Sequence, residues 1–112
     1  KKGTHPHMRK IETQMNEAIA SDKNWSSGNT QVTTENGISF VYLHGNKIAE
    51  VTDDAVTVFD GGWQSKTTKS RLNAIIDRFC DPITDGVYQS DFQWFVMDNN
   101  EAKPFVNGYT FA

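Results

Sequence analysis

The sequence contains one cysteine, Cys80, and three prolines among 112 residues. A single cysteine excludes an internal disulfide and any metal site built from several thiolates. Cys80 ends an apolar helical pattern, where a small buried side chain in a reducing compartment is the expected role. The chain has no apolar run of 18 or more residues and no signal-peptide pattern. We therefore expect no contact with a membrane.

The chain also lacks an excess of positive charge, with 11 Lys and Arg against 14 Asp and Glu and a formal net charge of −3. An acidic chain disfavours non-specific nucleic-acid binding over its whole surface, although a local basic patch can still bind phosphates. No residue spacing matches a known catalytic set, and the P-loop spacing is absent. The sequence therefore favours a non-enzymatic protein and indicates no specific metal or cofactor.

Residues 1–7 include His5 and His7 and are typical of an expression-tag remnant. Met8 has the sequence context of a natural start. We expect residues 8–112 to form a single domain, which is long enough to bury a hydrophobic core without a disulfide or metal.

Two segments have the 3.6-residue periodicity of amphipathic helices. Residues 9–21 present Ile11, Met15, Ala18 and Ile19 on one side, with Lys10, Glu12, Asn16 and Glu17 expected to face solvent. Residues 66–80 place Leu72, Ile75, Ile76 and Phe79 in one stripe. Ser65 or Thr67 is the expected N-cap of the second helix, and Asp81-Pro82 ends it.

Between and after the helices the turns predict strands. Asn36-Gly37 is a strong hairpin signal between residues 31–35 and 38–44, and further strands are expected at 47–51 and 55–59. A last hairpin is expected from residues 87–97 and 103–111, while Trp25 lies in a turn segment that covers the core. The fold class is therefore α+β, with one antiparallel sheet of four to six strands covered on one face by two helices in the order αββββαββ.

Three blocks in this order resemble short accessory proteins of tailed bacteriophages. They are MRKIE with the following Asn24-Trp25, VYLHGNKIA at 41–49, and KTTKSRLNA at 66–74. The resemblance covers residues 8–76 and supplies no catalytic residue. It implies a viral protein that acts in the cytoplasm of an infected bacterium.

The start of the second helix is the candidate binding site. Cations are disfavoured at a helix N-terminus by about 0.3–1 kcal/mol each, yet this end is basic. Exposed amides, hydroxyls and cations there suit a phosphate or carboxylate, and an indole can stack on a base. The candidate residues are Trp63, Lys66, Thr67, Thr68, Lys69, Arg71 and Arg78. Alternatively, Lys69 and Arg71 form an ordinary solvated helix face paired with Asp60 or Asp77.

The remaining polar residues give weaker signals. His44 lies in a tight turn and is more typical of a turn residue than of a metal ligand. Turn aspartates are numerous, and a metal-dependent nuclease needs two or three of them to converge. Their excess could instead form a DNA-mimicking surface, although interspersed lysines argue against it.

Three functional hypotheses follow. The first is a non-enzymatic phage protein that binds and modulates a host macromolecule, such as a defence or transcription component. The second is a nucleic-acid or nucleotide-binding module using the basic start of the 66–80 helix. The third is a small metal-dependent nuclease. The strand at 109–111 could also pair with a second copy of the chain.

Overall fold

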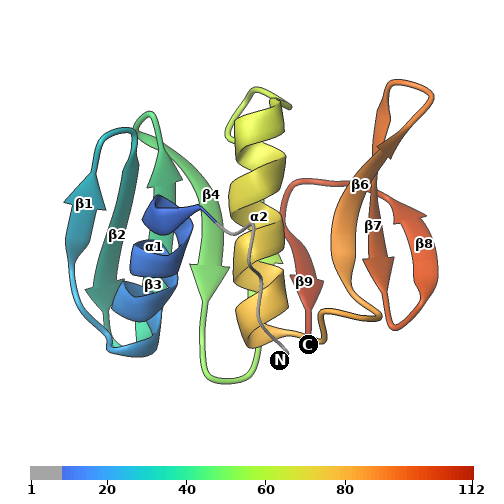
Figure 1. Ribbon diagram of the computed structural model, residues 1–112. Helices are drawn as coiled ribbons and strands as arrows, with labels where there is room; N and C mark the ends of the chain where they lie inside the picture. Colours follow the sequence, from blue (N-terminus) through green and yellow to red (C-terminus); the bar gives the residue numbers. More distant parts are fainter. Residues whose placement is uncertain (1–8) are drawn as a thin grey trace.

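The computed structural model describes residues 9–112, so the expected leader at 1–7 lies outside the described residues. Two helices and nine strands follow one another along this part of the chain (Figure 1). They are α1 (Lys10–Ala20), β1 (Trp25–Ser27), β2 (Thr30–Glu35), β3 (Ile38–Leu43), β4 (Asn46–Val51), β5 (Val56–Val58), α2 (Lys66–Phe79), β6 (Gly86–Ser90), β7 (Gln93–Asp98), β8 (Glu101–Pro104) and β9 (Tyr109–Phe111).

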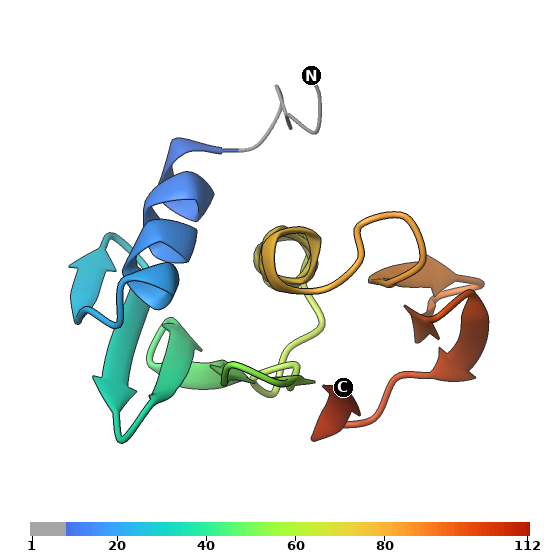
Figure 2. The same cartoon turned by 90° about the horizontal axis from the view of Figure 1, so that it is seen from below.

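The strands form two antiparallel sheets. The large sheet has the order β1-β2-β3-β4-β5-β9, and the small sheet has the order β6-β7-β8. Both helices lie on the same face of the large sheet, and the small sheet stands beside α2 (Figure 2). The α+β class, the antiparallel pairing and the placement of the helices are confirmed.

The hydrophobic core lies between the two helices and the large sheet. Along β3, Ser39, Val41 and Leu43 are buried while the residues between them are only half-buried, as the period-two pattern predicts. Met15 of α1 and Leu72 of α2 are fully buried against this face. The core extends to the small sheet through the side chains of Val87, Trp94 and Val96.

The predicted Asn36-Gly37 hairpin is confirmed, with φ of 53° and 79° at its two central residues. In the next hairpin the positive φ angles, 52° and 79°, fall on His44 and Gly45. Both turns therefore place glycine second, where a positive φ carries no steric cost.

The C-terminal third differs most from the expectation. Residues 87–97 are two strands, because Asp91 and Phe92 both have positive φ and reverse the chain between β6 and β7. Residues 103–111 are also two strands, since β8 pairs with β7 whereas β9 pairs with β5 of the large sheet. The expected single sheet is thus divided in two, and Trp25 begins a short edge strand instead of lying in a turn.

Candidate functional site

The loop before α2 holds Trp63 in a defined position at the surface. The backbone N–H of Gly62 donates to Asp60 Oδ1 over 2.7 Å, and Gly61 and Gly62 have φ of 69° and 88°. The Trp63 carbonyl accepts from Ser65 N at 3.0 Å and from Thr68 Oγ1 at 3.2 Å. The indole is nevertheless 76% exposed. A fixed backbone therefore presents an aromatic ring to solvent.

The first turn of α2 uses its hydroxyls internally. Ser65 is the N-cap, as predicted, and its Oγ accepts from Thr68 N over 3.1 Å. Thr68 is buried, so the expectation that its hydroxyl faces a ligand is corrected: the hydroxyl serves the cap and the Trp63 carbonyl instead. Thr67 is half-buried on the same turn.

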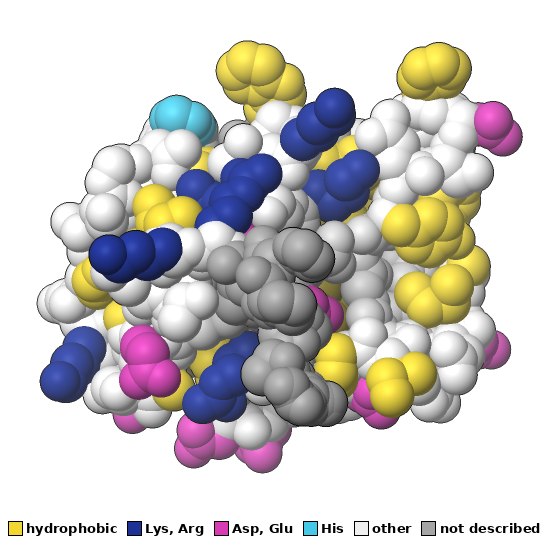
Figure 3. All heavy atoms as spheres, in the orientation of Figure 1, with side chains coloured by type: hydrophobic (Ala, Val, Ile, Leu, Met, Phe, Trp, Pro, Cys, Tyr) yellow, Lys and Arg dark blue, Asp and Glu magenta, His cyan; other side chains and the backbone are white. Residues whose placement is uncertain are grey.

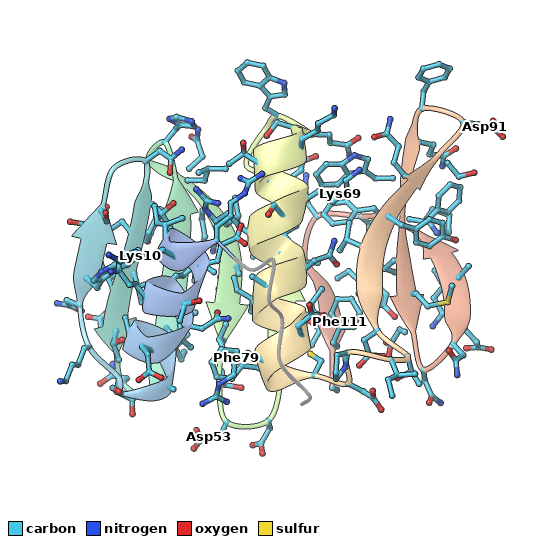
Figure 4. All side chains as sticks on the ribbon, viewed as in Figure 1. Lys10, Asp53, Lys69, Phe79, Asp91 and Phe111 are labelled. Carbon is cyan, nitrogen blue, oxygen red and sulfur yellow. The ribbon has the colours of Figure 1, made fainter. Side chains whose placement is uncertain are left out.

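Lys66 and Lys69 are the cations that remain available at this end of α2. Lys66 is exposed, and Lys69 is half-buried with its Nζ 3.4 Å from Gln89 Oε1 of β6. Figure 4 shows Lys69 pointing from α2 toward the small sheet. Within residues 9–112 neither lysine forms an ion pair with a carboxylate.

Arg71 does not belong to this surface, which corrects its assignment as a ligand-binding residue. Its side chain is 4% exposed and forms a salt bridge of 2.8 Å with Glu12 of α1. Arg71 also donates to Thr30 Oγ1 at 3.0 Å and to Asn29 Oδ1 at 3.2 Å. Arg71 does not pair with Asp60 or Asp77, the alternative that the sequence offered, because its guanidinium points from α2 toward α1.

The prediction that the polar residues of α1 face solvent is also wrong at two positions. Glu12 and Asn16 are buried rather than solvent-facing. Glu12 accepts from Arg71 and from Ser70 Oγ, the latter at 2.6 Å, while Asn16 Nδ2 donates 3.0 Å to the Ala74 carbonyl. These polar residues face α2. The buried side of α1 is therefore wider than its apolar residues alone indicate.

Arg78 lies in the last turn of α2, about 18 Å from the first turn at 1.5 Å per residue. Its guanidinium lies 5.0 Å from the centre of the Phe79 ring. It lines an open cavity of about 570 Å³ that also includes Asp53, Asp81 and Asp85. The structure therefore separates Arg78 from Lys66 and Lys69.

His44 is an exposed turn residue, and it shares a cleft of about 190 Å³ with Asp60, Trp63 and Thr68. Across residues 9–112 no three His, Cys, Asp or Glu side chains gather in a way that could hold a metal.

Phe92 is the exposed residue that sequence reasoning missed. It is 96% exposed at the tip of the β6–β7 hairpin, with φ of 64°. Asp91 and Phe92 continue the polar–apolar alternation of residues 87–97, so the pattern predicts one uninterrupted strand. Asp-Phe is not among the common hairpin dipeptides, so the turn is not apparent from composition.

The small sheet has an apolar outer face. The register places Tyr88, Phe95 and Pro104 side by side, and Met97 beside Ala102 in the next row. The rings of Tyr88 and Phe95 are stacked with their centres 5.5 Å apart. Figure 3 shows hydrophobic side chains gathered over this sheet.

Neither described helix is long and apolar enough to cross a lipid bilayer. No curated protein and no solved structure matches the chain. The family model described as Kyanoviridae Gp96 protein matches residues 8–112. This match confirms the resemblance to phage accessory proteins inferred from the sequence. The chain therefore belongs to the Kyanoviridae Gp96 protein family, a family of bacteriophage proteins.

Proposed function

We propose that this phage accessory protein is not an enzyme and acts by binding a host protein in the cytoplasm of the infected bacterium. The observation that carries the proposal is the outer face of the small sheet. Tyr88, Phe95 and Met97 are only half-buried there, and Ala102 and Pro104 are exposed.

The chemistry of this face favours a protein partner. According to the strand register, the five side chains on this face are apolar or aromatic, and none of them is charged. Protein interfaces are depleted of charge at their centre and enriched in Tyr, Phe and Met. A host protein with a flat apolar surface is the matching partner, and a defence or transcription component remains the proposed class.

A second copy of the chain is an alternative partner. Strand β9 ends the large sheet, so within the described residues one of its edges has no neighbouring strand. Unpaired edge amides and carbonyls can extend a sheet into another chain. Sedimentation equilibrium distinguishes this case, because a homodimer doubles the mass in the absence of any host component.

The test compares two exposed alanines. Ala102 lies on the apolar face and Ala20 lies at the end of α1, and both are exposed. Ala102→Glu places a charge in the proposed interface without removing packed atoms, whereas Ala20→Glu adds the same charge elsewhere. We expect immobilised wild type and Ala20→Glu to retain one stoichiometric host protein, and Ala102→Glu to lose it. Equal retention by all three proteins contradicts the proposal.

A further inference from the structure

The β6–β7 hairpin differs from the two preceding hairpins of the same chain. Gly37 and Gly45 occupy the second central position of their turns, with φ of 79° in both cases. Phe92 takes this position in the β6–β7 turn with φ of 64°. A bulky residue in the left-handed region costs about 1–3 kcal/mol. The strain comes from the Cβ against the backbone, and the ring is 96% exposed, so packing within the chain does not compensate for it.

A second aromatic ring is exposed at the same end of the molecule. The loop that carries Trp63 and the β6–β7 hairpin both project at the end where α2 begins (Figure 1). The Trp63 backbone is held by Asp60, Ser65 and Thr68, so its indole is presented without further ordering of the loop. Groups that are already ordered lose less entropy on binding.

The first turn of α2 supplies positive charge beside these rings. Lys69 reaches across to Gln89 of β6, which places its ammonium between the helix and the hairpin. Lys66 is exposed on the same turn. We call Trp63, Lys66, Lys69 and Phe92 the aromatic–lysine rim. Asp91 lies at the hairpin tip. The carboxylate of Asp60 is hydrogen-bonded within its own loop.

The opposite end of the protein, where α2 ends, carries negative charge. The cavity near the end of α2 is lined by Asp22, Asp53, Asp54, Asp81 and Asp85. Figure 3 shows Lys and Arg side chains near the upper end of α2 and Asp and Glu side chains gathered at the lower end. A polyanion is therefore repelled from one end of the protein and attracted to the rim.

We propose that the aromatic–lysine rim binds single-stranded nucleic acid, through a surface separate from the apolar face of the small sheet. Trp63 and Phe92 each stack on an unpaired base, and Lys66 and Lys69 contact the phosphates between them. Stacking on aromatic rings next to a cationic track is the usual chemistry of single-strand binding without sequence preference. A duplex is disfavoured because its bases are not accessible to the two rings.

The test measures fluorescence anisotropy of a labelled twelve-residue oligothymidylate at about 50 mM salt. We expect Phe92→Gly and Trp63→Ser each to weaken binding by about fivefold or more, since stacking contributes that much per base. Ile83→Ser is the matched control, because Ile83 is an 88% exposed apolar residue beyond the other end of α2. Binding by this variant should equal that of wild type.

Salt dependence tests the role of the lysines. Two phosphate contacts predict a log–log slope of about −1.4 for a single strand. Lys66→Ala together with Lys69→Ala should flatten this slope toward zero. The proposal is overturned if the oligonucleotide does not bind, if a duplex of equal length binds as tightly, or if Phe92→Gly binds like wild type. Equal binding of a polyglutamate peptide through the same residues also overturns it and indicates an acidic protein ligand.

Discussion

The guanidinium of Arg71 in α2 donates to the carboxylate of Glu12 in α1 over 2.8 Å, with both side chains 4% exposed. Further bonds from Arg71 reach Asn29 and Thr30, at the start of β2. One side chain therefore joins both helices to the large sheet. Arg71, one of the residues predicted to bind an external anion, instead holds the fold together.

Replacement of Arg71 should destabilise the protein strongly. Arg71→Leu leaves the Glu12 carboxylate buried without its partner, and breaking a buried pair in this way costs about 3–5 kcal/mol. The measurement is the free energy of unfolding from urea titration at pH 7. The double variant Glu12→Leu with Arg71→Leu should recover part of the loss, because no charge is then left buried. A loss below about 1 kcal/mol in the single variant contradicts the structural role.

Replacement of Phe92 should have the opposite effect on stability. Phe92→Gly relieves the strain of a positive φ at a bulky residue, and we expect the free energy of unfolding to rise by about 1 kcal/mol. Gly37→Phe is the reciprocal control, since Gly37 has φ of 79° and its Cβ position contacts nothing within 4 Å. This variant should lose a similar amount. Loss of stability in Phe92→Gly would show that the ring packs on the protein.

Tyr109 should make the fold sensitive to alkali. Burial and the nearby carboxylate of Asp98, 2.6 Å from the hydroxyl, raise the pKa of the Tyr109 phenol from 10.0 to about 12. Between these values the unfolded phenol loses its proton while the folded one keeps it, so the stabilisation is complete below pH 10 and is lost as pH rises toward 12. Urea midpoints from pH 9 to 11.5 should fall more steeply in wild type than in Tyr109→Phe. Parallel curves for the two proteins contradict this assignment.

Cys80 should react slowly in the folded protein. Burial, with smaller contributions from Asp85 and Asp98, raises the pKa of its thiol from 9.0 to about 12. The thiolate is the reactive form. At pH 8 we therefore expect the rate of reaction with a disulfide reagent to be about a hundredfold or more lower than in urea-unfolded protein. Similar rates in both states contradict a half-buried, shielded thiol at this position.

The elements with regular periodicity were predictable because local rules decide them. The stripe from Leu72 to Phe79 defines α2, Ser65 caps it, and the alternation of β3 identifies its buried face. The Asn36-Gly37 turn has a dipeptide whose positive φ angles are intrinsically accessible. These features depend on neighbours within a few residues in the sequence.

The candidate site was less predictable because its residues meet through packing. Arg71 is a cation on a surface helix, and this pattern predicts that it is exposed. Phe92 is an apolar residue in a strand pattern, and this pattern predicts that it is buried. Both predictions are wrong. Arg71 is buried because it pairs with Glu12, which lies 59 residues away in the sequence, and Phe92 is exposed because the chain turns at Asp91.

The sequence by itself determined the α+β class, the two helices, the main hairpins and the family. Only the tertiary structure decided which charges face solvent, because a cation's exposure depends on whether a distant carboxylate lies within hydrogen-bonding distance. The tertiary structure also divided the strands between two sheets, since β8 and β9 differ in their partners rather than in their local pattern.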